Sequence, residues 1–240
     1  MLSIDTTVGQ LVTERPSRSR VFEALGVNYC CGGKRSLGEV CAEKGLDATT
    51  VLRMLEAYEL PGAGSEDGKD WSEAPMTELV GHIVEVHHGY LKEALPRLER
   101  LVGRVATVHG EGHPEILELR ETFGTLKPEL EAHLLKEEEV LFPMCRELEE
   151  AEVRPEFHRR SVENPIRTLV AEHEEVGGVL LRMRELTGGY EPPEGACNTY
   201  RAMLDGLEEL ERDVHLHVHK ENNVLFPKAS AAEAALPAST

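Results

Sequence analysis

Two copies of one motif place a histidine and a glutamate four residues apart. The pattern HxxKExxVLFP runs from His133 to Pro143 and again from His217 to Pro227. On an α-helix, residues i and i+4 project from the same face one turn apart. His133 therefore lies beside Glu137, and His217 beside Glu221. Imidazole and carboxylate groups placed in this way are suited to binding a metal ion together.

The two motifs belong to a longer internal repeat. They begin 84 residues apart, and a second pair of histidines, His88 and His173, is separated by 85 residues. Apolar residues follow His88 and His173 at the same increments. Such a fixed period indicates duplication of a helix pair within one domain.

The repeated histidines and glutamates occupy positions where a hydrophobic core is expected. Leu130, His133, Glu137, Val140 and Met144 follow the three and four spacing of one apolar helix face. An ionised glutamate buried there costs several kcal/mol unless a cation neutralises it. The alternative is a set of core polar residues that hydrogen-bond to one another, but this does not explain their symmetric placement in the repeat. The predicted metal ligands are His88, His133, Glu137, His173, His217 and Glu221.

Six ligands in two equivalent halves predict two metal ions that share the carboxylates. No cysteine lies on these faces, and mixed imidazole and carboxylate ligation leaves iron, manganese and zinc all open. Six ligands do not saturate two octahedral ions. The open positions favour redox or diatomic-gas chemistry over a purely structural role.

Helices must hold these residues. Leu, Glu, Ala and Arg are abundant and aromatic residues make up only 5% of the chain, which favours an all-α fold. Periodicity predicts short helices near 6–14, 17–25, 36–44 and 48–60, and long ones near 74–108, 114–150, 160–187 and 195–227. We expect a small helical module (1–60), a linker (61–73), a four-helix bundle (74–228) and a flexible tail (229–240).

Charge and composition limit the possible functions. The 240 residues carry a formal net charge of −18, which disfavours nucleic acid and anionic membranes as partners. No stretch approaches the roughly 20 apolar residues of a bilayer span, and the first ten residues lack the features of a signal peptide. Five irregularly spaced cysteines suit a reducing compartment. We therefore expect a cytoplasmic protein.

Cys30 and Cys31 lie in a YCCGG turn and have two interpretations. One is a small buried pair at a tight turn. The other is that Lys34 and Arg35 lower the pKa of the thiols and favour reactive thiolates. We also expect packing roles for Cys41, Cys145 and Cys197. Among the remaining histidines, we place His87 near the ligands or in solvent, and we expect His215 and His219 to be exposed.

These motifs carry a family resemblance. The duplicated HxxxE bundle resembles the hemerythrin-like proteins. With the YCCGG module, the chain is similar over nearly its full length to the RIC family of di-iron proteins for repair of iron–sulfur clusters. The resemblance implies two non-haem irons with an oxo or hydroxo bridge. It implies terminal ligands His88, His133, His173 and His217, and bridging ligands Glu137 and Glu221.

The resulting functional prediction is repair of iron–sulfur clusters damaged by nitric oxide or oxidative stress, by donation of iron to the damaged proteins. Cys30 and Cys31 would assist docking or transfer. Two alternatives stay open: reduction of nitric oxide at the di-iron centre, and a sensor that binds oxygen or nitric oxide. Formation of a homodimer is also left open.

Overall fold

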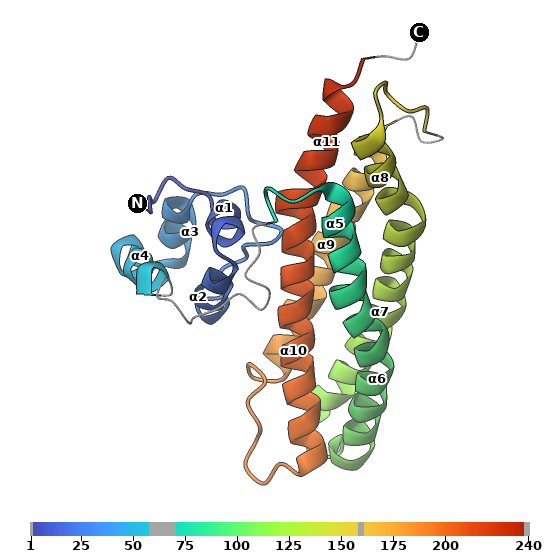
Figure 1. Ribbon diagram of the computed structural model, residues 1–240. Helices are drawn as coiled ribbons and strands as arrows, with labels where there is room; N and C mark the ends of the chain where they lie inside the picture. Colours follow the sequence, from blue (N-terminus) through green and yellow to red (C-terminus); the bar gives the residue numbers. More distant parts are fainter. Residues whose placement is uncertain (1, 58–70, 158–160, 238–240) are drawn as a thin grey trace. The chain divides into compact units, whose positions relative to one another are not determined.

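The fold is helical. The computed structural model describes residues 2–57, 71–157 and 161–237 (Figure 1). Within these ranges the regular structure consists of helices, apart from one isolated antiparallel bridge between Thr7 and Ser36. The predicted all-α class is therefore confirmed. None of the described helices combines the length and the apolar character needed to cross a bilayer.

The chain forms two compact units. The first contains residues Met1–Val80, Leu148–Pro155 and His215–Thr240, and the second contains Gly81–Glu147 and Glu156–Val214. We describe each unit by itself.

Long helices packed side by side make up the second unit (Figure 1). A π-helical segment, η2 (Ile83–His88), leads into α6 (Gly89–His109). Helix α7 (Pro114–Lys136) continues as a second π-helical segment, η3 (Glu137–Leu141). Helix α9 (Glu163–Leu186) and the first part of α10 (Asn198–Lys220) complete the unit.

Leucines fill the interior of the second unit. Helix α7 packs against α6 and α9. Helix α10 approaches α6 so closely that a Cβ atom on Gly206 would lie 2.7 Å from Leu98 Cδ2. The fully buried leucines of this unit are Leu91, Leu95, Leu98, Leu119, Leu126, Leu141, Leu180, Leu207 and Leu210. Burial of each such side chain contributes about 1.5–3 kcal/mol, so these helices are held mainly by their apolar faces.

Short, well-capped helices form the N-terminal part of the first unit. They are α1 (Val8–Glu14), η1 (Pro16–Arg18), α2 (Ser19–Ala24), α3 (Leu37–Lys44) and α4 (Ala48–Ala57). Thr7 caps α1 by accepting from Gln10 N–H at 3.2 Å. Ser36 and Glu39 form a capping box at the start of α3. Gly45 ends α3 with a φ of 66°, a conformation that glycine adopts without strain.

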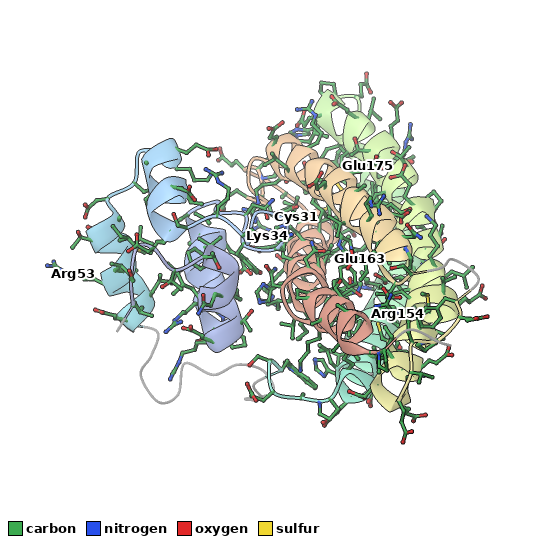
Figure 2. All side chains as sticks on the ribbon, turned by 90° about the horizontal axis from the view of Figure 1, so that it is seen from above. Cys31, Lys34, Arg53, Arg154, Glu163 and Glu175 are labelled. Atoms are coloured by element: carbon green, nitrogen blue, oxygen red, sulfur yellow. The ribbon has the colours of Figure 1, made fainter. Side chains whose placement is uncertain are left out.

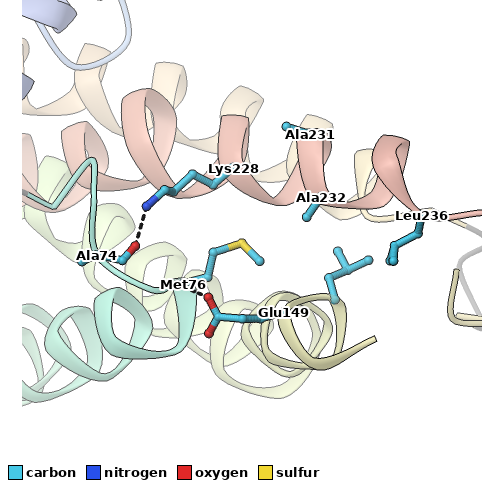
Figure 3. Close-up of a pocket in the computed structure, with 8 residues that line it drawn as sticks. Ala74, Met76, Glu149, Lys228, Ala231, Ala232 and Leu236 are labelled. Carbon is cyan, nitrogen blue, oxygen red and sulfur yellow. Dashed lines mark hydrogen bonds between the residues drawn. The ribbon is translucent and has the colours of Figure 1, made fainter. Parts of the chain in front are cut away.

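The rest of the first unit contains the start of α5 (Met76–His82), the end of α8 (Phe142–Glu150), η4 (Glu221–Leu225) and α11 (Phe226–Ala235). Side chains of α8 and α11 hold the start of α5. Glu149 accepts from Met76 N–H at 2.6 Å and from Thr77 N–H at 2.9 Å, and Lys228 donates to the Ala74 carbonyl. Residues of these segments line an open pocket with a volume of about 470 Å³. Figure 3 shows the side chains that line it.

The helices observed lie close to those predicted, with one difference near the C-terminal end. The linker expected at 61–73 falls outside the described residues except at 71–73. The segment 229–240, expected to be a flexible tail, is helical to Ala235, because α11 continues directly from η4 and buries Ala229 and Glu233. Residues 238–240 lie outside the described residues.

Candidate metal centre

Three histidines converge on one buried glutamate in the second unit. Glu137 has 0% exposure. His133 Nε2 lies 3.0 Å and His173 Nε2 lies 3.9 Å from Glu137 Oε1, and His88 Nε2 lies 3.3 Å from Glu137 Oε2. One ligand atom from each of His133, Glu137 and His173 lies within 4.8 Å of the others. The structure thus brings together four of the six predicted ligands in this unit.

The other two predicted ligands are paired in the first unit. His217 Nε2 lies 3.2 Å from Glu221 Oε1, and the side chains are 1% and 0% exposed. This pair has the same i, i+4 arrangement as His133 and Glu137. The two copies of the sequence motif therefore have equivalent local geometry.

Wide helical turns occur at the predicted ligands. The π-helical segment η3 begins at Glu137, and η4 begins at Glu221 at the equivalent point of the repeat. A third π-helical segment, η2, ends at His88. One π turn inserts an extra residue and rotates the side chains that follow it, and such turns occur frequently at functional sites. Their recurrence at the same place in both copies indicates that the helix winding is adapted to the ligands.

Carboxylates outside the set of predicted ligands orient two of the histidines. His88 Nδ1 lies 2.7 Å from Glu138 Oε1, which also accepts from Lys92 Nζ at 2.7 Å. His133 Nδ1 lies 2.8 Å from Glu172 Oε2, and Lys136 donates to the other oxygen of Glu172. A neutral imidazole that donates its Nδ1–H to a carboxylate presents the Nε2 lone pair on its opposite side. Histidines that bind metals are commonly held in this way.

The donor chemistry fits a bound cation. With Nδ1–H donated to Glu138 and Glu172, the Nε2 lone pairs of His88 and His133 point at the oxygens of Glu137. His133 Nε2 also lies 3.0 Å from His173 Nε2. Lone pairs that face one another and a carboxylate repel in a dry interior, unless protons or a metal cation lie between them. Imidazole nitrogens and a carboxylate are ligands of iron, manganese and zinc.

Glu137 carries a negative charge in this setting. Burial by itself raises the pKa of the Glu137 carboxyl, but in the metal-free protein protonated histidines, His133 foremost, supply charge and hydrogen bonds that outweigh burial and hold this pKa well below its usual range. An anion and several imidazoles thus share one buried pocket.

Two flanking histidines differ from the expectation that they are exposed. His219 is buried and His215 is partly buried, because both pack against the Tyr29 ring, at centroid distances of 5.6 and 6.1 Å. Burial lowers the pKa of His219 to about 4, so its ring is neutral near pH 7. His87 is buried next to His88, and its Nδ1 lies 2.8 Å from Asp213 Oδ1.

For Cys30, the structure supports the interpretation of a buried residue at a tight turn rather than that of a reactive thiolate. This thiol is buried, and its contact with Cys31 and its burial together raise the pKa of Cys30 well above its usual value. Arg35 instead pairs with Glu43. Cys31 is partly exposed. Cys41 and Cys145 are buried as expected, whereas Cys197 is exposed beside His109, with 3.5 Å between Sγ and Nε2.

Both parts of the chain match families of known proteins. Residues 80–229 match the family described as the hemerythrin HHE cation binding domain. Residues 4–59 match a second family, described as a domain of unknown function (DUF542). A protein named iron–sulfur cluster repair protein YtfE, from Pectobacterium atrosepticum, is 33% identical over 229 residues, which cover 95% of this chain and 98% of the relative. The chain belongs to the hemerythrin HHE family, among the YtfE-type proteins.

Other relatives agree with this assignment. YtfE proteins from Escherichia coli and Shigella boydii are 34% identical over the same shares of the two chains. The family resemblance predicted from the HxxxE repeat and the YCCGG turn is therefore confirmed. Membership of a hemerythrin family implies a non-haem iron cofactor, and the buried histidine and glutamate cluster is able to hold a metal ion.

Sequence reasoning missed the groups that support the ligands. Neither Glu138 nor Glu172 was among the residues singled out from the sequence. Both act on histidines of other helices, so no spacing along one helix reveals them. A usable signal was the position of each glutamate beside a predicted ligand, Glu138 after Glu137 and Glu172 before His173.

Proposed function

We propose that His88, His133, Glu137, His173, His217 and Glu221 bind two non-haem irons, with the glutamates as bridges and an oxo or hydroxo group completing the bridge. Support comes from the burial of all six side chains and from the equivalent geometry of the two HxxxE pairs. The repeat relates His88 to His173 in the same way.

When bound, iron supplies redox chemistry and coordination positions for small molecules. The residues of the chain prepare the place for it. Glu138 and Glu172 hold the rings of His88 and His133 with Nε2 inward, and the buried Glu137 supplies negative charge. All six side chains are buried, and the low dielectric of a buried site strengthens these electrostatic interactions.

The proposed function is repair of iron–sulfur clusters damaged by nitric oxide or oxidants, by transfer of iron to the damaged proteins. The convergence of three histidines on the buried Glu137 is the observation that carries this proposal. The relatives named as iron–sulfur cluster repair proteins support it, since they match almost the whole chain.

An anaerobic transfer assay tests this proposal. Iron-loaded protein is incubated with an iron–sulfur enzyme stripped of its cluster, together with sulfide and a thiol, and the recovered activity and transferred iron are measured. We expect transfer by the wild type and by Glu139→Gln, a change at an exposed glutamate of η3. Glu137→Gln, the matched change at the centre, should transfer almost none. In a parallel assay with nitric oxide and an added electron donor, catalytic formation of nitrous oxide with retention of iron would instead identify a reductase.

We propose an assisting role in transfer for the thiols of Cys30 and Cys31. The partly exposed Cys31 is the thiol able to meet an acceptor protein, and the buried Cys30 supports the turn. Transfer by a Cys31→Ser variant at the rate of the wild type would remove this part of the proposal.

A further inference from the structure

One side chain of η4 binds the backbone of the cysteine turn within the first unit. Asn223 Nδ2 donates to the Cys30 carbonyl at 3.0 Å and lies 3.5 Å from the Tyr29 carbonyl. The same nitrogen lies 3.4 Å from the His219 carbonyl and 3.2 Å from His219 Nδ1. A single amide thus joins the turn to the helix that carries Glu221.

Two glycines make room for this amide. A Cβ atom on Gly9 or on Gly33 would overlap Asn223 Oδ1, and the Gly9 N–H donates to the Gly33 carbonyl at 2.9 Å. The backbone of Gly9 and Gly33 therefore lies directly against the Asn223 side chain, and a residue with a Cβ atom would not fit at either position. The fit restricts Asn223 to one position.

Side-chain hydrogen bonds also hold the turn from within. Asn28 Oδ1 accepts from the backbone N–H groups of Cys31 and Gly32 at 3.0 and 3.2 Å, and from the Cys30 thiol at 3.3 Å. The peptide bond before Cys31 (Figure 2) is thus held at its carbonyl by Asn223 and at its N–H by Asn28.

Neighbouring contacts hold the same surfaces together. The Tyr29 ring packs on His219, and Thr13 Oγ1 lies 3.3 Å from His219 Nε2. Helix α1 and η4 are in direct contact. These contacts between the N-terminal helices and the segment around η4 thus flank Asn223.

Asn223 follows Glu221 by two residues inside η4. A change in the position of Glu221 shifts this short segment and hence the amide that holds the turn. We propose that Asn223 is a positioning residue that couples the Cys30–Cys31 turn to Glu221, so that metal occupancy controls the reactivity of the Cys31 thiol. This inference rests on the proposed role of Glu221 as a ligand.

Thiol labelling tests the coupling. Full-length protein, iron-free and iron-loaded, is alkylated with iodoacetamide, and labelling of Cys31 is measured by mass spectrometry against the exposed Cys197 as internal reference. We expect iron to slow the labelling of Cys31 by about fivefold or more, the lower end of usual couplings between sites.

Two variants test the role of Asn223. Asn223→Asp keeps the shape but places a carboxylate against the carbonyls of Tyr29 and Cys30, and Gly33→Ala places a Cβ atom against both the amide and the Tyr29 carbonyl. Both should label quickly at Cys31 whether or not iron is bound. Asn198→Ala, at an exposed asparagine of α10, should behave like the wild type.

The outcomes separate the two proposals. Iron content is measured on every sample, so protein that takes up no iron contradicts the proposed function. Iron-loaded wild type that labels at the rate of the iron-free protein contradicts the coupling alone, and this comparison needs no variant. Slow, iron-dependent labelling of a folded Asn223→Asp protein would show that another contact carries the coupling.

Discussion

At the scale of single residues, the centre depends on how each histidine is held. His88 and His133 have carboxylates at Nδ1 and face Glu137 with Nε2. The sequence repeat marks the six proposed ligands, and the structure buries all six. The roles of Glu138 and Glu172 were not predictable from the sequence, because their partners lie on other helices. His219 was wrongly expected to be exposed, since the contact that buries it comes from Tyr29, 190 residues earlier.

Glu137→Gln should lose most of the bound metal. The variant keeps the size of the side chain but removes the charge that neutralises a cation, and an amide bridges two ions poorly. Elemental analysis of purified protein measures the loss, with Glu139→Gln as the matched control. Equal iron in the two variants would contradict the role assigned to Glu137.

Glu138→Gln should weaken metal binding without abolishing it. Loss of the carboxylate leaves the His88 ring less basic and less firmly oriented, and comparable changes lower metal affinity by about 10- to 100-fold. Competition with an iron chelator gives the affinity. An affinity within about twofold of the wild-type value would show that Glu138 does not support His88.

At the scale of helices, the ends and irregular turns decide where the ligands lie. Periodicity predicted the long helices because their apolar faces are continuous. It did not predict the π-helical segments at His88, Glu137 and Glu221, because one extra residue per turn leaves no mark in the spacing of a short stretch. The continuation of α11 past residue 229 was also missed, since its alanine-rich sequence has weak patterning.

Glu149→Gln should destabilise the protein by about 1 kcal/mol near pH 7, the usual value of a helix N-terminal cap. Burial raises the pKa of Glu149, but the N–H groups of Thr77 and Met76 outweigh it, and the net pKa is below the usual 4.5. A lowered pKa contributes stability above 4.5, and this contribution is lost as pH falls through the lowered value.

Unfolding in denaturant at several pH values measures this effect. The difference between wild type and Glu149→Gln should be full at pH 6–7 and should shrink below about pH 4. Glu150→Gln, at the adjacent exposed glutamate, is the control. A difference that stays constant down to pH 3 would contradict the cap.

At the scale of the whole molecule, the metal is expected to contribute to folding. A chain with a net charge of −18 and two glutamates of 0% exposure gains stability from bound cations. The all-α class and the small helical module before the bundle were predictable from composition and periodicity. The packing of Asn223 against Gly9 and Gly33 was not, because it joins residues far apart in the chain.

Removal of metal should lower the melting temperature. A ligand that binds only the folded state stabilises it by about 2.7 kcal/mol at a concentration 100 times its dissociation constant. Scanning calorimetry of iron-free and iron-loaded protein measures the shift. The melting temperature of Glu137→Gln should change little when iron is added. A shift equal to that of the wild type would show that the metal binds elsewhere.

Metal content is the most direct test of the proposed di-iron centre. Elemental analysis of protein purified without oxygen should find about two irons per chain, in agreement with two ions shared among six ligands. Zinc as the resident metal, or no metal in the folded protein, would contradict the di-iron centre and the transfer of iron proposed from it.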